Sequence, residues 1–254
     1  MDIFKFNRGT LRILLIVAGM SLAGFLAAFF YYRSINHADD PRVVENKFRF
    51  MRYDKLMQEN KPAFAFLVLD TIESTFALAP GYSDSYEMGI VFNNRSSVYI
   101  TRALYHTEDS AQKQIFLDSA LRYSLVCIDW YNVWNDKYGS AGTETLTERI
   151  KPFFNPSDPV FKGRDVEKIL KKRVEDILLA QKELPRRFSV AYTNLGIVQR
   201  HQLKLDEAVE SYTKALKLWQ DNPSALSNLN VLMGQPPQDR SVLDKLFPPD
   251  KNKF

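Results

Sequence analysis

Apolar residues recur every three or four positions along most of the chain, and no alternation of the kind that marks strands persists. The clearest example is 191–223, where two such runs are separated by a short polar turn at 201–205. One face of the first run carries Tyr192, Leu195, Gly196 and Gln199, and one face of the second carries Ala208, Tyr212, Ala215 and Leu216. The pattern predicts two antiparallel helices whose backbones approach closely at Gly196 and Ala208.

The residue order in this stretch resembles the tetratricopeptide repeat, a helix–turn–helix unit of 34 residues with an aromatic, Leu-Gly, Ala, aromatic, Ala order. The same phase returns at 225–230, with Leu226 in place of Tyr192 and Asn230 in place of Gly196. We therefore place the best repeat at 189–222. The resemblance implies an α-solenoid, in which successive helical hairpins stack on one another.

Weaker copies of the pattern extend over the rest of 43–234. The expected helices are 48–59 paired with 61–78, 90–106 paired with 112–130, 166–184 followed by Pro185, and a closing helix at 223–233. We therefore predict an all-α fold with about three to four hairpins that resemble tetratricopeptide repeats.

An aromatic-rich segment at 131–165 interrupts this order. It holds two Asx-Pro turns and one short helical pattern at 143–151. We predict an irregular insertion. An insertion of this kind is either a binding loop or a flap packed over its own core, and the sequence leaves both open.

The N-terminal part predicts a membrane anchor. Residues 13–32 carry no charge over 20 positions, which matches the thickness of a hydrocarbon core, and the last four are aromatic. Basic residues in 1–12 favour a cytoplasmic N-terminus. The transmembrane helix is followed by a linker at 33–42, and a tail rich in proline and charged residues follows the repeats at 235–254. A cleaved signal peptide is the main alternative, although its apolar region is normally shorter.

Small residues recur along one face of the expected span, at Gly19, Ala23 and Ala27. Such a face lets two membrane helices approach, which suggests self-association, unless Gly and Ala are simply common in this span. By analogy with membrane-anchored members of the family, we expect a bacterial inner membrane with the repeat domain in the periplasm.

Charge and reactive residues indicate a binding protein. Lys and Arg number 34 against 30 acidic residues, and no concentrated basic face appears, so we expect no nucleic-acid partner. Cys127 is the single cysteine, which excludes an intrachain disulfide. The histidines, His37, His106 and His201, lack metal-ligand spacing, and no phosphate-binding Gly loop or nucleophile motif occurs. We therefore expect no enzyme activity, no cofactor and no metal.

The resemblance to tetratricopeptide repeats implies a concave groove, lined by the first helix of each hairpin, that takes a protein or peptide. By position, the residues implied to face it are Asn94, Thr193, Asn194, Ile197, Arg200, His201 and Asn228. An Asn amide suits an extended peptide because it donates and accepts hydrogen bonds. The alternative is that these Asn residues brace neighbouring helices. The carboxylate clamp of the chaperone-binding members is not supported, because Ser224 and Asn228 stand at two of its positions.

These features predict a membrane-anchored scaffold that docks a protein partner and helps to assemble or stabilise a cell-envelope complex, such as a secretion, cell-wall or flagellar-accessory machine. One alternative is a membrane-tethered periplasmic chaperone or quality-control factor. Another is an enzyme whose site lies in the aromatic insertion.

Overall fold

The computed structural model describes residues 13–26 and 38–237, and the described residues are helical without strands. The elements are α2 (Glu45–Gln58), α3 (Pro62–Leu78), α4 (Tyr86–Tyr105), α5 (Ser110–Tyr138), α6 (Thr143–Ile150), the 3-10 turns η1 (Lys151–Phe153) and η2 (Pro159–Phe161), α7 (Val166–His201), α8 (Leu205–Leu218) and α9 (Pro223–Leu232). The prediction of an all-α chain is confirmed for this part of the sequence.

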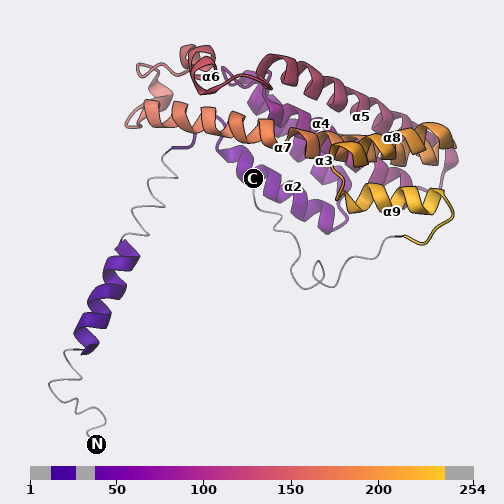
Figure 1. Cartoon of the computed structure of the whole chain (residues 1–254), viewed down its shortest axis with the longest axis horizontal. Coiled ribbons are helices and arrows are strands. Elements are labelled where there is room, and N and C mark those ends of the chain that lie inside the picture. Colours follow the sequence, from indigo (N-terminus) through magenta and orange to yellow (C-terminus); the bar gives the residue numbers. More distant parts are fainter. Residues whose placement is uncertain (1–12, 27–37, 238–254) are drawn as a thin grey trace, which may run out of the picture.

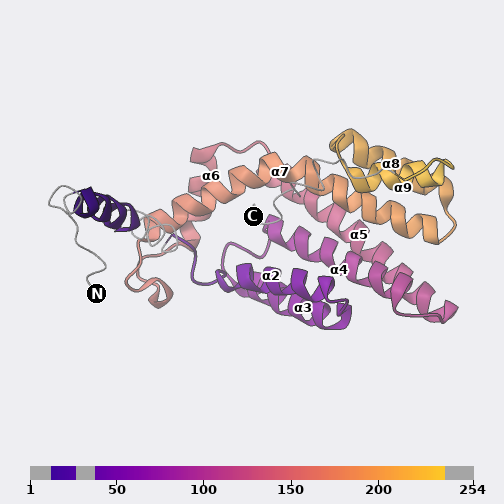
Figure 2. The ribbon, with the colours of Figure 1, turned by 90° about the horizontal axis from the view of Figure 1, so that it is seen from below.

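Three antiparallel hairpins follow one another, α2–α3, α4–α5 and α7–α8, and α9 closes the series (Figure 1). The second helix of each hairpin also packs on the first helix of the next: α3 on α4, α5 on α7 and α8 on α9. Figure 2 shows the hairpins stacked in this order. The arrangement is consistent with a helical-repeat solenoid, in which each unit buries the apolar side of its neighbour.

A glycine lies beneath a tyrosine where α4 crosses α5. A Cβ on Gly89 would clash with Cε1 of Tyr131, and Tyr131 is 1% exposed. Cys127, one turn before Tyr131, is also buried, and its Sγ donates to the carbonyl of Gly89 at 3.2 Å. Burial raises the pKa of the Cys127 thiol, so Cys127 behaves as a small core residue.

α7 differs from the prediction because it continues through Pro185 to His201 as one helix of 36 residues. The expectation that a helix ends before Pro185 is wrong. Proline removes one backbone hydrogen bond and is unfavourable in a helix interior. Packing outweighs this cost, since Ala180 and Leu184 are buried and the Gln181 amide donates to the carbonyls of Tyr138 at 2.5 Å and Ala141 at 2.9 Å.

The segment predicted as an irregular insertion, 131–165, is more regular than expected. Its first part, through Tyr138, belongs to α5, because three aromatic residues continue the buried face of that helix: Tyr131, Trp134 and Tyr138. The remainder covers the core in the manner of a flap. Phe154 and Phe161 are buried, and the Arg42 guanidinium lies over both rings, at 4.7 and 4.9 Å from their centroids.

The N-terminal helix of the described chain covers residues 13–26, and its side chains are exposed throughout. None of the helices within the described residues is both long and apolar enough to cross a membrane. The predicted span runs on to residue 32, and its part at 27–32 lies outside the described residues, as do the N-terminus at 1–12, residues 33–37 of the linker and the tail from 238.

Candidate protein-docking surface

The best repeat folds as its pattern predicts. In the second half of α7, Leu195, Gly196 and Gln199 are buried, and Gln199 accepts from the Ser211 hydroxyl of α8. The buried residues of α8 are Ala208, Ser211, Tyr212 and Ala215. The Tyr212 ring lies across Gly196, where a Cβ would stand 2.6 Å from its Cε1 atom. Burial raises the pKa of Tyr212 to about 12.

Two features that the repeat pattern did not predict set the ends of this unit. The turn between α7 and α8 contains Leu203 with φ 62°, a left-handed conformation that non-glycine residues rarely adopt. Asn222 precedes α9, where its Oδ1 accepts from the amides of Ser224 and Ala225 at 3.1 and 3.0 Å. The Asn-Pro pair at 222–223 is a sequence signal for such a cap.

Thr193 was predicted to line the groove, and the structure shows that it is buried instead. It is 4% exposed, its hydroxyl donates to the carbonyl of Ser189 at 2.8 Å, and it accepts from the Asn222 amide at 3.0 Å. Asn222 also donates to the Ser189 hydroxyl at 2.8 Å. Thr193 is therefore enclosed by the α8–α9 turn and is not accessible to a partner.

Asn194 links α7 to α4. Its amide donates to Oδ1 of Asn93 at 2.9 Å and to Oγ of Ser97 at 3.1 Å. Ser97 in turn bonds the Asn93 carbonyl, and Thr101 bonds the Ser97 carbonyl. Asn93, Ser97 and Thr101 recur every four residues, so they form one polar stripe along α4. Asn194 thus braces neighbouring helices, the alternative that the sequence left open.

We call the surface along these two helices the α4–α7 face and define it by eight partly exposed residues: Asn93, Asn94, Ser97, Thr101, Asn194, Ile197, Arg200 and His201. Asn94 and Arg200 lie at its edges, because helical spacing turns each of them by about 100° or more from the Asn93–Asn194 contact. The spacing of Asn93, Ser97 and Thr101 was visible in the sequence, but the repeat pattern points to Asn94 instead. Helix packing decides the difference, because Asn93 is the residue that meets Asn194.

The end of the face near the hairpin turns carries positive charge. Nη2 of Arg200 lies 3.3 Å from Nε2 of His201. Partial burial, followed by the charges of Arg200 and Lys113, lowers the pKa of His201. Ile197, one turn earlier, packs against the apolar cluster that joins α4, α5 and α7. An acidic group on a partner would be favoured here.

Asn228 is separate from the α4–α7 face. It lies on α9, and its amide bonds the carbonyl of Ser224 within the same helix at 2.8 Å. Asn94 is partly exposed on α4, and its carbonyl accepts from the Tyr53 hydroxyl of α2 at 3.3 Å. The three predicted Asn residues therefore do not form one ladder, because they stand on different helices with different neighbours.

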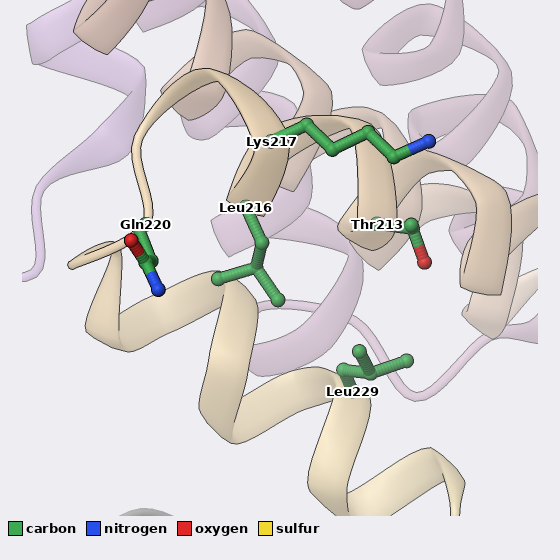
Figure 3. Close-up of a pocket in the computed structure, with 5 residues that line it drawn as sticks. All are labelled: Thr213, Leu216, Lys217, Gln220 and Leu229. Atoms are coloured by element: carbon green, nitrogen blue, oxygen red, sulfur yellow. The ribbon is translucent and has the colours of Figure 1, made fainter.

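Two hollows lie elsewhere on the described surface. One, of about 410 Å³, borders the Asp84–Lys137 ion pair at the end of α5. The other, of about 360 Å³, lies between α8 and α9 and is lined by Thr213, Leu216, Lys217, Gln220 and Leu229 (Figure 3). Neither is lined by residues of the α4–α7 face. Among the described residues, no cluster of His, Cys, Asp or Glu has the geometry to hold a metal ion.

Comparison with known proteins supports the repeat. The family model of the tetratricopeptide repeat matches residues 189–222, which comprise about the last third of α7, the whole of α8 and the turns that follow each of them. No curated protein and no solved structure matches the chain. The match supports the tetratricopeptide family for this segment, and a repeat of this kind indicates, in general, a scaffold for protein–protein interaction.

Proposed function

We propose that this protein is a membrane-anchored scaffold whose α4–α7 face docks a protein or peptide partner. The observation that carries the proposal is the Asn93–Asn194–Ser97 contact, which aligns the polar stripe of α4 with the first helix of the matched repeat. Both helices stand first in their hairpins, the position that lines the binding surface in this family. Proteins of the family are typically non-enzymatic scaffolds.

The chemistry of the face favours a partner segment that has backbone N–H and C=O groups free to form hydrogen bonds and an acidic residue at one end. The Asn94 side-chain amide can both donate to and accept from a bound backbone. The Thr101 hydroxyl donates to the Ser97 carbonyl, so it offers a partner only an acceptor. Arg200 and His201 lie at one end, with the charge of Lys113 nearby. A carboxylate beside Arg200 would form a charge-assisted hydrogen bond, which is stronger than a neutral one.

The membrane anchor is the second part of the proposal. The helix at 13–26 exposes large apolar side chains on all sides, including Ile13, Met20 and Phe25 at 64%, 71% and 67% exposure. So much exposed apolar surface favours burial in lipid or in a partner. The anchor would comprise residues 13–32. The helical domain would lie in the periplasm of a bacterium, where it would help to assemble or stabilise an envelope complex. Self-association through Gly19, Ala23 and Ala27 belongs to the same proposal.

Purification from gently solubilised membranes tests docking. The wild-type chain is compared with Arg200→Glu and with Lys214→Glu, a matched charge reversal at an exposed site on α8. We expect co-purifying proteins to be lost with Arg200→Glu and retained with Lys214→Glu. Equal retention by both variants would contradict a role for the α4–α7 face. N-terminal sequencing tests the anchor separately, because a mature chain that begins after residue 28 lacks it.

A further inference from the structure

One side of α3 exposes apolar surface to solvent. Phe64, Leu67 and Leu78 are 62%, 60% and 83% exposed. Helical spacing places them on one stripe, with Thr71 and Ser74 between them. We call these five residues the α3 stripe, and it is about 21 Å long from Phe64 to Leu78. Together with α2, α3 forms one edge of the stack of hairpins (Figure 2), and an apolar patch at such an edge indicates an interaction surface.

The α3 stripe carries no charge and no free hydrogen-bond donor. The two acidic residues of α3 lie to one side of it and pair with Arg95 of α4. The Thr71 hydroxyl donates to the carbonyl of Leu67 at 3.2 Å, and the Ser74 hydroxyl donates to the carbonyl of Asp70 at 2.8 Å. Burial of the stripe in an apolar medium therefore leaves no side-chain donor unsatisfied.

The stripe ends beside the point where the chain enters the helical domain. Leu78 and Phe153 line the same hollow. The Phe153 carbonyl accepts from Nη1 of Arg42 at 2.8 Å, so Arg42 lies close to this end of α3. The proposed anchor ends at residue 32, and the chain from there to Ala38 spans at most about 22 Å. The surface of the bilayer is therefore within reach of the stripe.

The chemistry of the stripe fits lipid better than it fits another protein. Interfaces between proteins carry direct hydrogen bonds and a polar rim. The hydroxyls of Thr71 and Ser74 have their protons committed to the backbone of α3, so they offer a partner no donor. In contact with lipid, by contrast, a helix must satisfy its donors internally, and the α3 stripe meets this requirement.

We propose that α3 lies along the surface of the lipid bilayer, with Phe64, Leu67 and Leu78 inserted at the boundary between headgroups and acyl chains. The inference rests on the proposed membrane anchor, which holds the domain at the bilayer and gives the stripe a high effective concentration of lipid. The α3 stripe shares no residue with the α4–α7 face, so it is a separate surface from the one proposed to dock a protein.

Reconstitution of the full chain in phosphatidylcholine vesicles tests the proposal. Thr71→Cys carries a fluorophore at the centre of the stripe, and the native Cys127 stays unlabelled because it is buried. The matched controls carry the same fluorophore at Asp129→Cys on α5 or at Glu210→Cys on α8, which are both exposed positions. Brominated acyl chains in the vesicles quench a fluorophore that enters the bilayer.

We expect brominated lipid to quench the fluorophore at residue 71 several-fold more than at residue 129 or 210. Phe64→Glu combined with Leu67→Glu should abolish this difference, because charged side chains are expelled from the bilayer. Ile115→Glu combined with Val133→Glu is the matched control on α5, where both residues are exposed, and it should leave the difference unchanged.

Flotation of the vesicles separates this proposal from the anchor. A chain that floats with the vesicles but shows equal quenching at all three labelled positions would overturn the docking of α3 and leave the anchor in place. A chain that does not float would overturn both.

Discussion

Tyr212 lies against Gly196 so closely that a Cβ on Gly196 would stand 2.6 Å from Cε1 of the ring. Real Cβ atoms essentially never approach a carbon this closely. The contact holds α7 against α8 at the centre of the matched repeat, where Tyr212 has no exposed surface. The glycine is therefore required by the space that the tyrosine fills.

Gly196→Ala should destabilise the fold by about 1–3 kcal/mol, the usual cost of overpacking a core. Denaturant unfolding of the full chain in detergent measures the change. In a Tyr212→Leu background the Gly196→Ala penalty should largely disappear. A penalty that persists without the ring would contradict the steric explanation.

Leu203→Gly should stabilise the turn between α7 and α8. Leu203 has φ 62° and is 83% exposed, so glycine relieves backbone strain and loses little burial. The left-handed conformation costs a non-glycine residue about 1–2 kcal/mol, and glycine's larger unfolded-state entropy offsets part of the gain. We expect a melting temperature above the wild type. Leu203→Ala keeps the strain and should give no such increase; if both variants behave alike, the conformational argument fails.

Asn194→Ala should destabilise the contact between α4 and α7 by about 0.5–1.5 kcal/mol, because it removes the hydrogen bonds to Asn93 and Ser97. Asn228→Ala is the matched control, since its amide bonds a carbonyl of its own helix at an exposed position. The free energies of unfolding of the two variants are compared. If both variants lose the same free energy of unfolding, the hydrogen bonds of Asn194 to α4 contribute no more than an exposed side-chain hydrogen bond does.

The sequence predicted the hairpins well because their apolar spacing is local. Gly196 and Tyr212 stand on faces that helical periodicity alone defines, and their contact follows from antiparallel pairing. The low helix propensity of Pro185 predicted that the helix ends before it. The helix continues because Ala180 and Leu184 are buried and hold α7 in place. Such tertiary contacts cannot be derived from spacing within one helix.

The candidate site was predicted less well. Ile197, Arg200 and His201 are partly exposed on α7, and their role in a groove stays a prediction. Thr193 is enclosed by Asn222 from the following turn. Asn93 was overlooked because the repeat register singled out Asn94. Both differences depend on how one hairpin is rotated against the next, which no local pattern specifies.

His201 should make stability depend on pH. Its lowered pKa means that the folded state binds fewer protons than the unfolded state, whose His titrates near 6.5. Stability should therefore fall as pH decreases through about 6.5 and should level off below the folded pKa. Unfolding free energies between pH 5 and 8 for the wild type and His201→Gln measure this. The variant should lose the slope in this window, and an identical slope in both proteins would exclude His201 as its source.

The central claim is that a partner docks on the α4–α7 face. Site-specific photo-crosslinking in intact cells tests it most directly, with a photoreactive residue at Asn94 or His201 on the face, and at Asp129 or Glu210 on the exposed sides of α5 and α8. We predict that the same protein is captured from Asn94 and from His201, and from neither control position. Capture of a protein from Asp129 or Glu210, with none from Asn94 and His201, would contradict the account.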